Sequence, residues 1–131
     1  MQEQAANAAG ANASVRPEIE IDWRYTDEQA LIRGMLEKDD FAWLEFLGRF
    51  DALLTARIKL RMARWNPTLR STDLIEGIKG DIHERLQDGG TMRPLRGFDT
   101  RHGTLSVWLC RIADHATMRR LHALTSLDDD A

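Results

Sequence analysis

The chain has 131 residues and a formal net charge of −3, with 43% hydrophobic and 30% charged residues. This composition is typical of one globular domain, and the absence of any run of about 18 apolar residues excludes a transmembrane helix. The N-terminus lacks the basic-then-apolar layout of a signal peptide, and Cys110 is the single cysteine. We therefore expect a cytoplasmic protein without an internal disulfide.

The first 25 residues are predicted to be a disordered leader. Residues 1–18 are rich in Ala and Asn and hold almost no large apolar side chains. Such a segment cannot bury enough surface to offset the entropy lost on ordering. The following "IEIDWRY" could form a short strand, but no second strand is apparent, so it is interpreted as a lead-in to the first helix.

Two helices are predicted in the first half of the chain. The first covers about residues 27–36, with Thr26 as its N-cap and acidic side chains in its first turn. The second covers about residues 40–65, because large apolar side chains recur there at steps of three or four and form one stripe. Asn66 and Pro67 end this helix.

Two more helices are predicted in the second half. The third begins near Ser71 or Thr72 and ends before Gly89, and after a loop the fourth covers about residues 104–124. The expected fold class is therefore all-α, a small bundle of about four helices that occupies residues 26–124. An acidic tail follows at residues 125–131.

Charge is segregated along this sequence. Residues 27–51 hold seven acidic and three basic side chains, whereas residues 57–70 hold five basic and no acidic ones. Residues 91–123 hold six arginines, three histidines and two aspartates. A domain with such segregation can bind a polyanion through one face although its net charge is negative.

The fourth helix and the loop before it concentrate cations around one tryptophan. Trp108 lies at the edge between the apolar stripe of the helix and a cationic sector. Aligned cations can follow backbone phosphates, and an aromatic edge can stack on an unpaired base. The alternative is that Trp108 is a core residue and the cations are a solvated face. The candidate DNA-binding residues are Arg93, Arg96, Arg101, His102, Trp108, Arg111, His115, Arg119, Arg120 and His122.

The third helix carries two interior glycines, Gly77 and Gly80, each of which costs about 1 kcal/mol relative to Ala. Both lie opposite the isoleucines and beside Asp81 and Glu84. A smooth face lined by acidic groups would let another helix approach closely, which predicts a docking surface for a partner. The residues equally allow the alternative that the glycines divide this helix into two short pieces.

No catalytic or metal site is expected. The four histidines and Cys110 have none of the spacings of a metal site, and no glycine-rich phosphate loop follows a strand. Cys110 and His115 are five residues apart, whereas helical neighbours are three or four apart, so a nucleophile–base pair is not indicated. We predict a binding domain without enzymatic activity and without a cofactor.

Three segments resemble the extracytoplasmic-function sigma factors of bacterial RNA polymerase. "DEQALIRGMLEKDDFAWLEFLGRFDALL" is similar to the family's opening helices, with Ala42-Trp43 and Arg49-Phe50 as its small-aromatic and arginine-aromatic pairs. "STDLIEGI" resembles the polymerase-docking helix, although Glu76-Gly77 stands where the family usually has Gln-Glu. "LRGFDTRHGTLSVWLCRIADHATMRRLH" resembles the segment that opens and reads the promoter −10 element, with its Gly-Thr, Trp-Leu and Arg-Ile-Ala in the family's order.

The resemblance implies a sigma region 2-like domain that docks on the clamp coiled coil of RNA polymerase core and captures the single-stranded −10 element. The resemblance also suggests an anti-sigma factor as a further partner. The family continues through an acidic linker into a domain that reads the −35 element, and residues 125–131 are either a tail or the beginning of that linker. The alternative is a sigma-like protein-interaction module that has lost polymerase or DNA binding. The implied polymerase-binding residues are Asp73, Glu76, Gly77, Lys79, Gly80 and His83.

Overall fold

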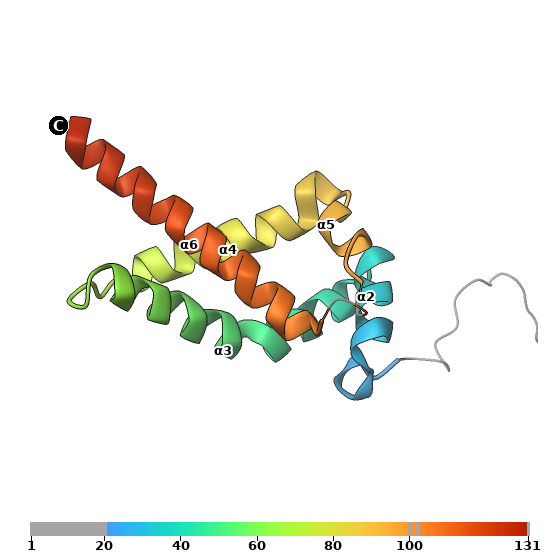
Figure 1. Ribbon diagram of the computed structural model, residues 1–131. Coiled ribbons are helices and arrows are strands. Elements are labelled where there is room, and N and C mark those ends of the chain that lie inside the picture. Colours follow the sequence, from blue (N-terminus) through green and yellow to red (C-terminus); the bar gives the residue numbers. More distant parts are fainter. Residues whose placement is uncertain (1–20, 100, 102, 131) are drawn as a thin grey trace, which may run out of the picture.

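The computed structural model describes residues 21–99, 101 and 103–130, with side chains up to Thr125 (Figure 1). The predicted disorder of residues 1–20 lies outside this part of the chain, as does His102. Every regular element within the described residues is helical, so the all-α prediction is confirmed. The elements are the 3-10 turn η2 (Trp23–Tyr25), α2 (Glu28–Leu36), α3 (Asp40–Trp65), α4 (Thr72–Gln87), the 3-10 turn η3 (Asp88–Gly90), α5 (Arg93–Arg96) and α6 (Leu105–Asp130).

The beginning of α2 differs from the prediction by one residue. The N-cap is Asp27, whose carboxylate accepts a hydrogen bond from the Ala30 N–H at 2.7 Å. Thr26 instead donates its hydroxyl to the carbonyl of Trp23 at 2.8 Å and closes η2. Thr26 therefore caps the preceding turn, and "IEIDWRY" leads into α2 through a 3-10 turn rather than a strand.

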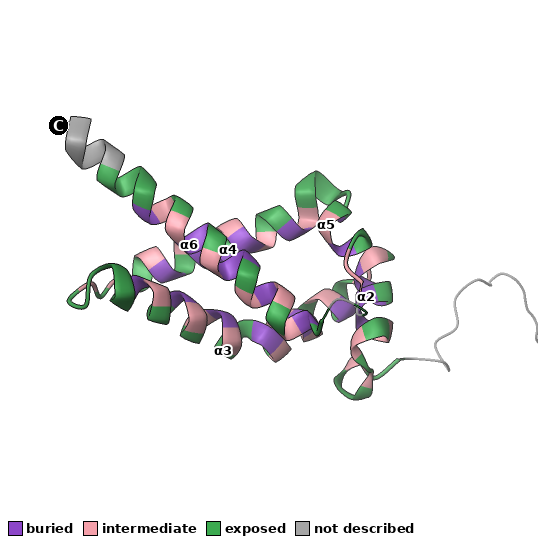
Figure 2. Ribbon diagram, viewed as in Figure 1, coloured by how far each residue is buried: buried purple, intermediate pink, exposed green. Residues whose placement is uncertain are grey.

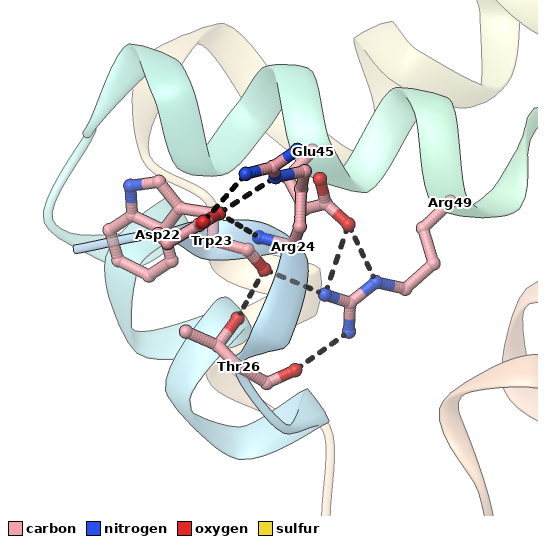
Figure 3. A network of polar contacts seen from close by, with 6 residues as sticks. All are labelled: Asp22, Trp23, Arg24, Thr26, Glu45 and Arg49. Atoms are coloured by element: carbon pink, nitrogen blue, oxygen red, sulfur yellow. Dashed lines mark hydrogen bonds and ion pairs between the residues drawn. The ribbon is translucent and has the colours of Figure 1, made fainter.

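Arg49 of α3 fastens this N-terminal turn to the bundle (Figure 3). Its guanidinium donates to the carbonyl oxygens of Trp23 at 2.9 Å and Thr26 at 3.2 Å, and to Glu45 at 3.1 Å. A methyl group at Gly34 of α2 would overlap the Trp23 ring, so the ring lies directly on that glycine. The packed domain therefore begins before Thr26, within the segment predicted to be a leader.

The buried side of α3 winds around the helix as it passes its neighbours. Its six buried residues follow each other at steps of four, and each step turns about 40° around a helix of 3.6 residues per turn. The row can therefore contact α2 at one end and both α4 and α6 further along (Figure 2). Its members are Ala42, Phe46, Phe50, Leu54, Ile58 and Met62.

The two predicted core faces of the later helices are present. Ile75, Ile78, Ile82 and Leu86 of α4 are buried, and Leu74 packs at the margin of the core. The apolar stripe expected in α6 is buried at Leu105, Leu109, Ile112 and Ala116, and the buried set also includes Ala113, Thr117 and Leu121. In Figure 1, α6 crosses the other long helices and runs on past them to Asp130, six residues beyond the predicted end.

The segment predicted as a loop between α4 and α6 contains the short helix α5. Met92, in the left-handed region at φ 57°, reverses the chain after η3, and Pro94 stands in the first turn of α5. Met92 and Leu95 are buried, so their burial holds this segment on the bundle. At its end the carboxylate of Glu28 in α2 accepts from the Leu105 N–H at 3.3 Å and helps to fix the beginning of α6.

Candidate nucleic-acid interface

Three basic side chains of α6 form an exposed row, which we call the α6 row: Arg111, His115 and Arg119. They follow each other at steps of four residues, or about 6 Å along the helix axis. None of them forms a hydrogen bond or ion pair with another described residue. Their donors are therefore free to bind an anion.

A pocket of 160 Å³ opens where the loop before α6 meets the first turns of that helix. Trp108 packs on Phe98 there, with the ring centroids 4.9 Å apart and the planes tilted by 43°. Arg111, the first member of the α6 row, also lines the pocket. Trp108 is partly buried against the core and also lines this pocket, so its packing role is observed while its stacking on a base stays a prediction. The pocket residues are Gly97, Phe98, Asp99, Thr104, Val107, Trp108 and Arg111.

The arginines before α6 are exposed, but each has an intramolecular contact. Arg101 forms an ion pair with Asp99 at 2.7 Å, and this hydrogen bond raises the pKa of the guanidinium. Arg93 lies 3.6 Å from Asp88, and Nε of Arg96 donates to the Thr91 carbonyl at 2.9 Å. Two of these three cations are thus partly neutralised by nearby acids, so the loop adds less free charge than the sequence suggested.

Two of the predicted DNA-binding residues at the far end of α6 contact other helices. Arg120 turns toward α4, where it binds both carboxylate oxygens of Asp81 at 2.8 and 2.9 Å. The imidazole of His122 lies edge-on to Trp65 of α3, with the ring centroids 5.3 Å apart. Arg120 is therefore a cross-link between helices and not a continuation of the exposed row.

Arginines of α3 that were not predicted as site residues lie beside the α6 row. Arg57 and Arg61 both approach Asp114 of α6, at 2.7 Å and 3.8 Å. The hydrogen bond from Arg57, helped by the charge of Arg61, lowers the pKa of Asp114 below its usual value. The five basic and no acidic side chains of residues 57–70 indicated a cationic surface in the sequence. The crossing of α3 and α6 places this surface next to the α6 row.

The residues predicted to bind polymerase divide into two groups in α4. Asp73, Glu76 and Gly80 are exposed, and a methyl group at Gly80 would meet no atom within 4 Å. The helix runs unbroken from Thr72 to Gln87, so the alternative that the glycines divide it is wrong. The carbonyl of Gly77 accepts from the Arg120 guanidinium at 3.4 Å, and a methyl group at Gly77 would require that guanidinium to shift.

Lys79 and His83 face inward rather than toward a partner. Lys79 is buried, and its ammonium lies 2.9 Å from both Asp51 of α3 and Glu76. The hydrogen bond to Glu76, followed by the one to Asp51, raises the pKa of Lys79. His83 packs edge-on against Trp43 at 6.0 Å, and burial lowers its pKa. The exposed members of the predicted polymerase-binding set are thus Asp73, Gly80 and Glu76, and Glu76 also pairs with Lys79.

The described residues contain no group of three His, Cys, Asp or Glu side chains that could hold a metal ion. None of the described helices has the length and apolar character needed to cross a membrane. Comparison of the chain with protein-family models, with curated proteins and with solved structures finds no match. The function is therefore inferred from the residues and their geometry.

Proposed function

We propose that the protein is a sigma factor-type transcription initiation domain that captures the non-template strand of the promoter −10 element. The observation that carries the proposal is the pocket walled by Phe98 and Trp108, which opens at the beginning of the α6 row. An aromatic wall beside a row of cations suits single-stranded DNA, because bases stack on aromatic rings while cations hold the phosphates. The sequence resemblance supports the same function.

In this mechanism the row and the pocket act on different parts of the strand. Arg111, His115 and Arg119 hold the phosphates, which fixes the strand without reading its sequence. An unstacked base enters beside Trp108, where the ring compensates for the stacking lost in the duplex. Reading of the base falls to the polar groups of the pocket, among them the Thr104 hydroxyl.

Docking on RNA polymerase is proposed for the exposed part of α4, Asp73, Glu76 and Gly80. These residues lie on a different helix from the α6 row, so polymerase and DNA would not compete for the same side chains. The carboxylates offer acceptors to arginines of a partner, and Gly80 leaves room for close approach of a helix.

The second candidate is a sigma-like module that binds a regulatory protein and has lost polymerase affinity. The observation that favours it is the internal use of Gly77, Lys79 and His83, which removes half of the six residues implied for polymerase docking. It predicts binding to neither core polymerase nor DNA.

The test measures both activities on the purified protein. Fluorescence anisotropy with a labelled forked DNA that carries an unpaired −10 strand should show binding that weakens with salt, with a slope of about 0.7 for each phosphate contact on a single strand. A pull-down with core polymerase tests docking. Arg111→Gln should weaken DNA binding, whereas Lys59→Gln, an exposed residue of α3 without a role in the site, should not. A flat salt response would contradict the DNA interface, and loss of both activities would favour the second candidate.

A further inference from the structure

Two arginines of α3 share a single carboxylate of α6. Arg57 binds Asp114 in the fork-to-fork manner, with Nε on one oxygen at 2.7 Å and Nη2 on the other at 2.8 Å. Arg61 approaches the same carboxylate only to 3.8 Å and forms no hydrogen bond with it. Arg57 therefore holds the close bidentate position, and Arg61 interacts with Asp114 only through charge at longer range.

The single charge of Asp114 therefore balances only one of the two guanidinium charges. The Nε of Arg61 is enclosed and has no hydrogen-bond acceptor in the described part of the chain, while the side chain as a whole is 29% exposed. A donor left in this state costs about 1–3 kcal/mol, and such groups call for an explanation in a folded protein. The two arginines and Asp114 together carry one net positive charge, and no other acid of the described residues pairs with either arginine.

This excess charge lies next to the α6 row. His115 follows Asp114 directly in α6, and its charge acts on the Asp114 carboxyl. The pairs Arg57–Asp114 and Trp65–His122 show that α3 and α6 run in the same direction where they meet. The cations of the two helices therefore form two neighbouring lines that advance together along the surface.

We propose that Arg57 and Arg61 of α3 form a second phosphate-binding line beside the α6 row, and that Asp114 holds this line in place while moderating its charge. The partner is the same single strand, so the inference rests on the proposed function. The strand would cross from α6 onto α3, and a phosphate at Arg61 would balance the second guanidinium charge. A guanidinium suits this role because its planar donors match phosphate oxygens.

The role of Asp114 separates this proposal from a purely structural ion pair. If the cluster only joins α3 to α6, then replacing Asp114 lowers stability and leaves DNA affinity unchanged or reduced. If Asp114 moderates a phosphate-binding line, then its replacement frees Arg57 as well and strengthens DNA binding. The two roles thus predict opposite changes in affinity for one variant.

The experiment compares Arg61→Gln, Asp114→Asn, Arg111→Gln and Lys59→Gln by anisotropy with labelled single-stranded DNA over a range of salt concentrations. Arg61→Gln should lower affinity about fivefold at 0.1 M salt and reduce the salt slope by about 0.7, which corresponds to one lost contact. Asp114→Asn should raise affinity and steepen the slope by a similar amount. Lys59→Gln removes one charge from the same helix two residues away and should match the wild type.

The outcomes distinguish this inference from the function on which it rests. If Arg111→Gln weakens binding while Arg61→Gln behaves like Lys59→Gln, the second line is refuted and the α6 row stands. If the wild-type protein does not bind single-stranded DNA, both are refuted. Thermal melts of each variant show whether it folds. Arg61 makes no hydrogen bond within the described residues, so Arg61→Gln is expected to fold even if Asp114→Asn does not. In that case the affinity of Arg61→Gln alone tests the second phosphate-binding line.

Discussion

Trp108→Ala should reduce both the stability of the domain and its affinity for DNA. The loss of stability depends on the burial of Trp108 and its contact with Phe98, and the loss of affinity depends on its exposure to the pocket. Truncation of a fully buried tryptophan costs about 3–5 kcal/mol, and the aromatic pair with Phe98 accounts for about 0.5–1.5 kcal/mol. Because Trp108 is only partly buried and one side of it faces the pocket, we expect about 2–3 kcal/mol. At about 4 °C per kcal/mol for a domain of this size, the melting temperature should fall by about 8–12 °C.

Loss of the stacking surface should weaken binding of a forked DNA by about 1–3 kcal/mol, or about 5- to 150-fold. The assay is anisotropy with forked DNA at a temperature where the variant is folded, as shown by circular dichroism. Trp43→Ala is a matched control, since Trp43 is also partly buried and packs on one phenylalanine, at 5.3 Å, but lies outside the pocket. It should lose comparable stability without losing affinity. Unchanged affinity in folded Trp108→Ala would refute the role of the pocket as the base site.

Three further predictions concern other parts of the bundle. Gly80→Trp should abolish binding to core polymerase with little change in the thermal melt. Gly77→Ala should also change the melt little, because the shift that its methyl group forces on the Arg120 guanidinium, 2.9 Å away, offsets the gain of about 1 kcal/mol that Ala has over Gly in a helix. Burial lowers the pKa of His83 in the folded protein. As the pH falls, the unfolded chain therefore binds a proton at His83 at a higher pH than the folded chain does, and stability should fall below about pH 6.5. His83→Gln should flatten this part of the curve of stability against pH. Arg49→Gln removes the guanidinium that donates to the carbonyl groups of Trp23 and Thr26. Amide hydrogen exchange should increase at residues 23–26 and change little in the buried parts of α4 and α6. A uniform increase across the domain would contradict the conclusion that Arg49 holds only the N-terminal turn in place.

The boundaries of α3 and α4 could be predicted because local chemistry sets them. Asp39 accepts hydrogen bonds from the Phe41 and Ala42 N–H groups, and the Asn66-Pro67 step ends α3 at the predicted residue. Ser71 caps α4 in the same way, with its hydroxyl accepting from the Leu74 N–H. Each of these contacts joins residues within three positions, so the sequence alone contains the necessary information.

The direction of several polar side chains in the candidate site depends on contacts distant in sequence. Arg120 looked like another exposed cation until the crossing of α4 and α6 placed Asp81, 39 residues earlier, beside it. The burial of Lys79 had a detectable sequence pattern, because it follows Ile75 by four positions and so shares its face. The partner that makes this burial possible, Asp51 of α3, depends on tertiary packing.

The position of α6 in the core also determines when the domain can fold during synthesis. Leu105, Leu109 and Ala113 are fully buried beside α3 and α4, which leave the ribosome first. At about 5–20 residues per second, the 34 residues between the end of α4 at Gln87 and Leu121 take about 2–7 s to add. Helices form in about a microsecond, so α2, α3 and α4 exist through that interval with one apolar side uncovered. The nascent chain therefore passes through a stage at which chaperones and proteases can reach its core, and that stage ends when the helix that carries the cationic row is released.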